Sequence, residues 1–256
     1  MSGWLERRSS ARSLELLREL ALSDFRLKYE DSVLGYAWSM LSPLLMLAIY
    51  YFVFRHVVGV TTPGYLVYLV VGIVYWTFFQ DCTFAGLNAL QGKAGVLKSI
   101  AVPPGLVVGG GLLSTFITLG INSAVLVLAL LLAGRLSPLA PLALLPIGCL
   151  ALLAAGTSFL VGLLHVHFRD TGLIWGILLQ ALFWLTPVVY VVDGPLAELL
   201  YLNPVARCLY LIRWFLVYNY FPAPRFILLT VAVSVIVFAA GLAAFQRRAR
   251  ALPELL

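Results

Sequence analysis

Long apolar runs alternate with short polar breaks along most of this chain. Six of the runs reach the length of about 20 residues that a helix needs to cross a bilayer. They cover approximately residues 36–58, 65–87, 104–133, 139–164, 173–192 and 226–245. The pattern predicts an all-α membrane protein with six transmembrane helices, in which residues 36–246 form the transmembrane domain. An even number of spans places both ends of the chain on one side.

The distribution of positive charge indicates which side that is. Twelve of the 17 Lys and Arg residues fall in segments that share a side with the two ends, and five fall in the opposite segments. Lys and Arg are enriched in cytoplasmic segments. We therefore expect residues 1–35 and the tail at residues 247–256 to be cytoplasmic. The first 30 residues contain no apolar stretch typical of a cleavable signal peptide.

Residues 10–30 have the pattern of an amphipathic helix. Leu14, Leu17, Ala21 and Phe25 fall on one helical stripe, and the charged residues lie largely off it. Such a helix is expected to lie in the membrane interface on the cytoplasmic side. A fully solvated helix is the alternative.

Residues 193–222 are too apolar for an ordinary loop. Four prolines divide the segment into short pieces: Pro195, Pro204, Pro222 and Pro224. Short apolar pieces favour re-entrant or interfacial gate helices on the outer side, between the fifth and sixth spans. A seventh short span is the alternative, but it would carry the arginines of the tail to the disfavoured side.

Composition agrees with a membrane setting. The chain is 62% hydrophobic and 11% charged, with a mean hydropathy of +1.00, whereas a soluble domain has about 25% charged residues. The net charge of +6 does not indicate a nucleic-acid partner, because nine basic residues lie before residue 30 or after residue 246, beside apolar runs and anionic lipid. The three cysteines are far apart and are expected to be packing residues rather than disulfide or metal ligands.

The sequence contains no constellation typical of a soluble enzyme. It has no Walker A, HExxH or GxSxG pattern. We expect no catalytic residue, no metal and no cofactor in this chain. His165 and His167 form an HxH pair without a third ligand nearby, so a position at the cytoplasmic end of the fourth span is favoured over metal binding. The glycines from Gly109 to Gly111 favour close helix approach.

Aromatic residues are dense in the first, second and fifth runs. Aromatic planes suit the C–H faces of sugar rings; packing against lipid is the alternative. The candidates for a sugar path are Tyr36, Trp38, Tyr50, Tyr51, Phe183, Trp184 and Tyr190. Asp81 is a candidate intramembrane functional residue, unless the second span ends near residue 80. Arg207 and Arg213 are candidate charges at an outer gate.

Residues 167–172 form a compact charged break between the fourth and fifth runs. Such a turn can contact a cytoplasmic partner, although a solvated turn is the alternative. Together with the cytoplasmic segment between the second and third runs, it supplies the candidate partner-contacting residues His167, Phe168, Arg169, Asp170, Lys93 and Lys98.

Several of these segments together resemble the permeases of ABC transporters that export polysaccharides, such as O-antigen and teichoic-acid exporters. The resemblance extends from about residue 14 to residue 245. The matching stretches are FRLKYEDSVLGYAWSMLSPLLMLAIYYFVF from Phe25, GIVYWTFF from Gly72, LKSIAVPP from Leu97, HFRDTG from His167, FWLTPVVY from Phe183 and YLNP from Tyr201. The chain departs from the family at Arg207, where many relatives carry an acidic residue after the Asn-Pro pair.

The resemblance implies a function and a set of partners. It implies a homodimer in the bacterial cytoplasmic (inner) membrane, two separate ATP-binding-cassette subunits that bind ATP and magnesium, and a lipid-linked polysaccharide as cargo. It also implies that the six partner-contacting residues couple the permease to the ATPase. Export of a drug or small lipid, or a membrane enzyme acting on lipid-linked sugars, are the alternatives.

Overall fold

The computed structural model describes residues 15–23, 38–92, 103–192 and 194–248. Among the predicted functional residues, Tyr36, Lys93 and Lys98 lie outside these ranges, as do most of the predicted cytoplasmic N-terminus and the tail from residue 249. Within the described ranges all regular elements are helices. Residues 15–23 form a helical segment that precedes α2.

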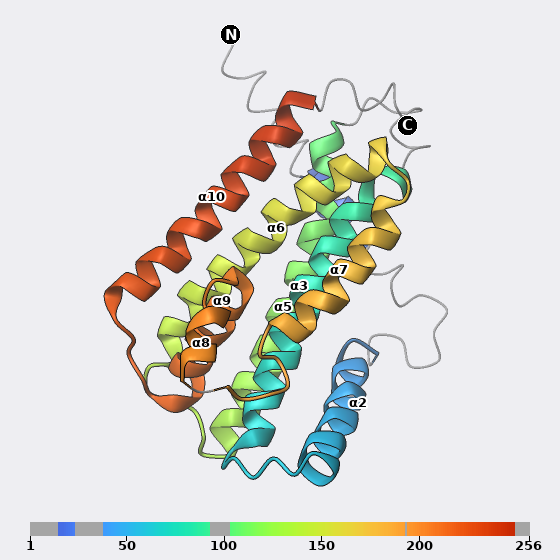
Figure 1. Ribbon diagram of the computed structural model, residues 1–256. Helices are drawn as coiled ribbons and strands as arrows, with labels where there is room; N and C mark the ends of the chain where they lie inside the picture. Colours follow the sequence, from blue (N-terminus) through green and yellow to red (C-terminus); the bar gives the residue numbers. More distant parts are fainter. Residues whose placement is uncertain (1–14, 24–37, 93–102, 193, 249–256) are drawn as a thin grey trace.

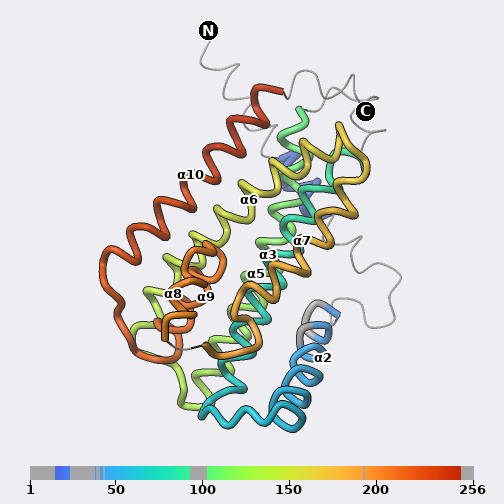
Figure 2. Tube along the Cα trace, viewed as in Figure 1, coloured from blue at the N-terminus to red at the C-terminus, as the bar shows by residue number. Residues whose placement is uncertain are grey.

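The main helices alternate in direction along the chain. They are α2 (Trp38–Phe52), α3 (Tyr65–Gly92), α5 (Pro104–Leu132), α6 (Leu144–His167), α7 (Thr171–Leu185) and α10 (Pro224–Arg248). The end of the bundle that carries the α6–α7 turn also carries the end of α10; we call it the turn end. The short helices α8 (Pro195–Leu200) and α9 (Pro204–Arg213) lie at the opposite end, the α9 end (Figures 1 and 2).

Four helices are long and apolar enough to cross a membrane. They are Tyr65–Gly92, Pro104–Leu132, Ala140–His167, which joins the 3-10 helix η3 (Ala140–Ala143) to α6, and Pro224–Arg248. This confirms an all-α, multi-pass membrane protein. The predicted first and fifth spans correspond to shorter apolar helices, at Leu44–Val57 and Thr171–Leu185. The count of six spans therefore stays a prediction.

Helix α7 ends earlier than the expected boundary at residue 192. It stops at Leu185, and Thr186 adopts an extended conformation with φ −110° and ψ 127°. Pro187 explains the difference, because proline disfavours helical geometry in the residue before it and has no N–H of its own. Residues 186–190 consequently leave the helix while still buried or half-buried.

The expected re-entrant segment consists of short helices that begin at prolines. Pro195 and Pro204 occupy the first turns of α8 and α9, and α9 continues into a π-helix, η4 (Trp214–Tyr218). Proline suits a first turn because the N–H that it lacks would have no partner there. A second π-helix, η2 (Val53–Val57), follows α2. Whether α8 and α9 enter the membrane stays a prediction.

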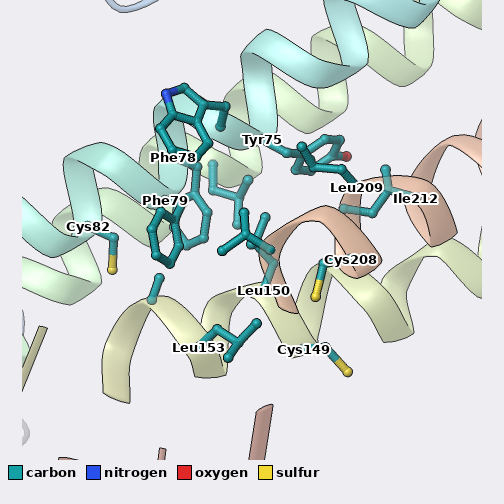
Figure 3. Packing of buried hydrophobic residues seen from close by; sticks show 14 of the residues in the cluster. Tyr75, Phe78, Phe79, Cys82, Cys149, Leu150, Leu153, Cys208, Leu209 and Ile212 are labelled. Atoms are coloured by element: carbon teal, nitrogen blue, oxygen red, sulfur yellow. The ribbon is translucent and has the colours of Figure 1, made fainter. Parts of the chain in front are cut away.

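Helix α6 is the centre of the bundle, with α3, α9 and α10 packed against it. Figure 3 shows side chains of α3, α6 and α9 meeting in one cluster, including Tyr75, Leu150 and Leu209. The three cysteines, at positions 82, 149 and 208, are buried there and are not in disulfides. They therefore act as packing residues, as expected.

Glycines permit the closest helix contacts. A Cβ on Gly110 of α5 would lie 2.8 Å from Leu20 Cβ, so the helical segment at residues 15–23 rests directly on α5. This is the close approach expected for the three-glycine run. The helical segment thus packs against the N-terminal part of α5. Its position in the membrane interface stays a prediction.

Gly156 of α6 should tolerate no side chain. A Cβ there would lie 2.6 Å from Phe238 Cα and 2.6 Å from the Val237 carbonyl oxygen of α10, both backbone atoms that cannot rotate away. We expect Gly156→Ala to lower stability by about 1–3 kcal/mol, measured as a lower thermal unfolding midpoint in lipid nanodiscs. Gly148→Ala is the matched control, because nothing lies within 4 Å of a Cβ at Gly148 in the same helix. Equal midpoints for the two variants would contradict this packing.

Candidate functional site

A cavity of about 530 Å³ lies between α2, α3 and α7. Its lining positions recur every three or four residues, as expected when one face of each helix borders the same space. The lining residues are Ser42, Met46 and Tyr50 of α2; Ile73, Trp76, Thr77, Gln80, Asp81 and Phe84 of α3; and Gly176, Leu179, Gln180, Phe183 and Trp184 of α7. We call this cavity the pocket.

The half of the pocket toward the α9 end is aromatic. Phe183 is its centre, stacked on Tyr50 at a ring-centroid distance of 5.6 Å and edge-on to Trp76 at 5.5 Å. Trp184 follows at 5.4 Å from Phe183 and remains 52% exposed. These rings come from three helices, so the aromatic surface exists only while α2, α3 and α7 keep their positions.

The half toward the turn end contains charged and amide groups beside the ring of Phe84. Gln80 and Asp81 of α3 are half-buried there, and Ser42 of α2 also lines the pocket. Thr77 and Gln180 lie between the polar and aromatic halves. Hydroxyl, amide and carboxyl groups therefore face the same space as the rings.

A side-chain hydrogen bond attaches helix α7 to α3 at the turn end of the pocket. Trp175 Nε1 donates to Thr83 Oγ1 of α3 at 3.2 Å, and the Thr83 hydroxyl donates in turn to the Gln80 carbonyl at 2.9 Å. Thr83 is fully buried. This bond holds the start of α7 against α3, so that the lining residues from Gly176 onward face the pocket.

At the other end of the pocket, four consecutive carbonyls after α7 accept hydrogen bonds from side chains. Tyr68 Oη of α3 lies 2.8 Å from the carbonyl oxygens of both Pro187 and Tyr190 and donates its one hydrogen to either of them, and Tyr65 Oη donates to Val189. Arg213 of α9 donates to the carbonyls of Pro187 and Val188. We call this arrangement of residues 187–190 with Tyr65, Tyr68 and Arg213 the carbonyl clamp.

Arg213 connects three elements within the carbonyl clamp. Its guanidinium donates to Pro187 O at 2.7 Å, Val188 O at 2.9 Å and Tyr68 O at 3.3 Å, and its Cζ lies 3.5 Å from the centroid of the Tyr68 ring. The side chain is 1% exposed. A buried cation is stable when its donors have acceptors and its charge is compensated, here by carbonyl dipoles, the end of α7 and an aromatic face.

Asn203 and Arg207 fix α9 in place. Asn203 caps α9 by accepting from Val205 N at 2.9 Å, and its amide donates to Thr186 Oγ1 at 2.8 Å. Arg207 donates to Phe226 O at 2.9 Å and to Thr230 Oγ1 at 3.1 Å, both in α10. Arg207 therefore joins α9 to α10, away from the pocket.

The α6–α7 turn is braced by hydrogen bonds. Phe168 N donates to Leu164 O at 2.8 Å, Thr171 Oγ1 donates to Phe168 O at 2.6 Å, and Gln91 Nε2 of α3 donates to His165 O at 2.9 Å. Arg169 and Asp170 are exposed, and Phe168 is 66% exposed. The turn thus presents two opposite charges and an aromatic ring on a braced support.

The pocket brings together four of the predicted functional residues, Tyr50, Asp81, Phe183 and Trp184. The other described aromatic candidates lie elsewhere. Trp38, at the start of α2, is 40% exposed, while Tyr51 stacks on Tyr65 at 6.4 Å. Tyr190 donates to the Trp184 carbonyl and belongs to the segment after α7. His167 bonds the Leu163 carbonyl through Nδ1 at 2.9 Å.

Sequence reasoning did not propose several residues that matter here. Trp76, Thr77 and Gln180 line the pocket, and Tyr65 and Tyr68 supply the hydroxyls of the carbonyl clamp. Spacing could have found the first three, because they continue the helical face of Asp81 or Phe183. Pro187 was the available sign that α7 ends early and that nearby carbonyls need donors.

The chain is similar to three proteins described as O-antigen export system permease protein RfbA. Two are from Klebsiella pneumoniae: one is 28% identical over 182 residues and the other 26% identical over 181 residues, each covering 70% of both chains. The third, from Myxococcus xanthus, is 25% identical over 240 residues, 91% of this chain and 92% of its own. No protein-family model matches the sequence. These similarities confirm the resemblance to export permeases that the motifs indicated.

Replacing Arg213 should disrupt the carbonyl clamp. Arg213→Ala leaves buried carbonyls without their charged donor, which we expect to cost about 3 kcal/mol and to lower the unfolding midpoint by roughly 6–12 °C in nanodiscs. Arg225→Ala, at an exposed arginine in the first turn of α10, should leave the midpoint unchanged. A midpoint for Arg213→Ala that equals the control would contradict this role.

Proposed function

We propose that this chain is the permease subunit of an ATP-driven ABC exporter that moves a lipid-linked polysaccharide of O-antigen type across the bacterial cytoplasmic membrane. The observation that carries the proposal is the similarity to three O-antigen export permeases over 70–91% of the chain. The pocket supports it, because rings and hydroxyl- or amide-bearing side chains together form a surface suited to sugars.

In the proposed arrangement the chain crosses the membrane six times. Helix α7 has 15 residues, about 22 Å at 1.5 Å per residue, which is short of the roughly 30 Å hydrocarbon core. Non-helical backbone at membrane depth requires partners for its polar groups. The carbonyl clamp supplies such partners to residues 187–190, so α7 and this segment together can serve as the fifth span.

The turn end is the cytoplasmic side in this proposal, and both termini lie there. Two copies of the chain form the pore, and two ATP-binding-cassette subunits, which bind ATP and magnesium, contact the α6–α7 turn. The braced turn supports this role because a displacement of Phe168 or Arg169 is passed to both α6 and α7. The residues expected to share in coupling are His167, Phe168, Arg169, Asp170, Lys93 and Lys98.

The two alternatives predict different effects when the protein is lost. Loss of an exporter of a drug or small lipid would leave the surface polysaccharide unchanged. Loss of an enzyme acting on lipid-linked sugars would change the structure of the glycan. The names of the similar proteins favour polysaccharide export over both.

Loss of the gene tests the proposal in the cells that carry it. We expect deletion to remove the polysaccharide from the cell surface and to leave it lipid-linked on the inner side, with its repeat unit unchanged. Expression of the chain from a plasmid should restore the surface signal, measured by surface labelling of glycans. Normal surface polysaccharide in the deletion strain would contradict the proposal.

Arg169 should couple ATP hydrolysis to export. Its side chain is exposed on the turn, so Arg169→Ala removes a partner contact without disturbing the core. We expect at least a tenfold loss of export while ATP hydrolysis by the assembled complex continues. Arg135→Ala is the matched control, since Arg135 is exposed between α5 and η3 at the opposite end. Full export by Arg169→Ala would rule out this contact.

A further inference from the structure

Helix α3 meets the region of the α6–α7 turn at three positions that are four residues apart. They are Thr83, Leu87 and Gln91, which this spacing places on one face of α3. The same face continues toward Trp76 and Gln80, which line the pocket. Contacts along this face therefore run from the turn end of the bundle to the pocket.

Gln91 joins the end of α3 to the end of α6. Its Nε2 donates to the carbonyl oxygen of His165 at 2.9 Å. The last four carbonyls of a helix have no partner within that helix, and His165 carries one of them, because α6 ends at His167. Gln91 therefore supplies from α3 a donor that α6 cannot supply itself.

Gly172, in the first turn of α7, lies close to both of the other helices. A Cβ on Gly172 would be 3.3 Å from His165 Cε1 and 3.8 Å from Leu87 Cδ2. Both of these side chains are buried. The start of α7 thus rests on a ring from α6 and on a leucine from α3, and such close packing leaves little room for α7 to move without them.

Trp175, one turn further along α7, provides the third contact. Its indole N–H donates to the buried hydroxyl of Thr83, which donates in turn to the carbonyl of Gln80. Because Gln80 lines the pocket, the contacts end at the pocket wall. We call the contacts of Thr83, Leu87 and Gln91 with His165, Gly172 and Trp175 the seam.

The seam is attached to both sides of the α6–α7 turn. His165 precedes the turn and Gly172 follows it, so a displacement of the exposed Arg169 between them acts on α6 and α7 together. Moving α7 past α3 would cost the Trp175–Thr83 hydrogen bond inside the bundle. Packed contacts shift between discrete arrangements rather than deform continuously. Helix α3 is therefore expected to move with the turn.

We propose that the seam passes a displacement of the α6–α7 turn to α3, and through α3 to the pocket, with Gln91, His165 and Trp175 as positioning residues. The inference rests on the proposed export function and adds a route by which the ATPase affects the pocket. In this route α3 and the start of α7 move as one unit, whereas the seam includes no residue of α2, the third helix around the pocket.

The purified chain, in lipid nanodiscs and without an ATPase, tests whether the seam is one unit. Gln91→Glu removes the donor to His165 and keeps the size of the side chain. We expect the indole proton of Trp175 to exchange with water about fivefold faster, which is the effect of one lost hydrogen bond on a local opening. NMR of nitrogen-15-labelled tryptophan measures this rate, and Trp175→Phe identifies the signal.

Two variants separate the lost donor from the added charge. Asn88→Asp adds the same charge at an exposed position of α3 outside the seam, and it should leave the exchange rate at Trp175 unchanged. Gln91→Lys restores a donor on a long side chain, and it should also leave the rate unchanged.

The assembled exporter tests whether the seam carries the signal. Gln91→Glu and Thr83→Val should each lower the amount of glycan exported per ATP hydrolysed by about fivefold, and Gln91→Lys should keep the original ratio. The double variant should lose no more than the larger of the two single losses, because both substitutions break one route. A purely structural role would lower the unfolding midpoint and leave this ratio unchanged.

Three results would each overturn the proposal. They are an unchanged exchange rate at Trp175 in Gln91→Glu, an unchanged export ratio, and additive losses in the double variant. The exchange measurement uses neither ATP nor transport, so it separates this inference from the proposed function. Faster exchange in Gln91→Glu, together with normal surface polysaccharide after deletion of the gene, would refute export and keep the seam as a mechanical unit.

Discussion

The structure depends on one constraint, which is that buried backbone carbonyls need donors from the protein. Pro187 ends α7 and leaves buried carbonyls that no helix satisfies. The carbonyl clamp answers this need with Arg213 and two tyrosine hydroxyls. Because Arg213 belongs to α9 and the tyrosines to α3, satisfying these carbonyls also fixes the positions of α3, α7 and α9 relative to one another.

The pocket follows from this attachment. Helix α7 is held to α3 by the Trp175–Thr83 hydrogen bond at the turn end and by the carbonyl clamp at the α9 end. Between the two attachments, one face of α7 borders the cavity, through Gly176, Leu179, Gln180, Phe183 and Trp184. The surface of α7 is largely exposed, because among its described residues only Leu179 is buried.

The fold was largely predictable because helical apolar runs and charge asymmetry are local properties of a sequence. The second, third, fourth and sixth apolar runs cover nearly the same residues as α3, α5, α6 and α10. The end of α7 was not predicted, because the apolar run continues past Pro187 whereas the helix stops at Leu185. Three of the aromatic candidates line the pocket: Tyr50, Phe183 and Trp184. Hydropathy alone could not distinguish them from Tyr51, which follows Tyr50 on α2 but points toward Tyr65. Arg213 was proposed as a gate charge, and its bonding to carbonyls depends on a contact between residues 25 and 26 positions apart.

The hydrogen bonds from Arg213 to the backbone that follows α7 can be measured directly. Solid-state NMR of the chain in lipid bilayers can measure the dipolar coupling between the guanidinium nitrogens of Arg213 and the carbonyl carbon of Val188. We expect a measurable coupling through space, because the 2.9 Å separation between the Arg213 nitrogen and the Val188 oxygen places the carbonyl carbon nearby. The absence of this coupling in the folded protein, with the guanidinium instead accessible to water, would contradict it.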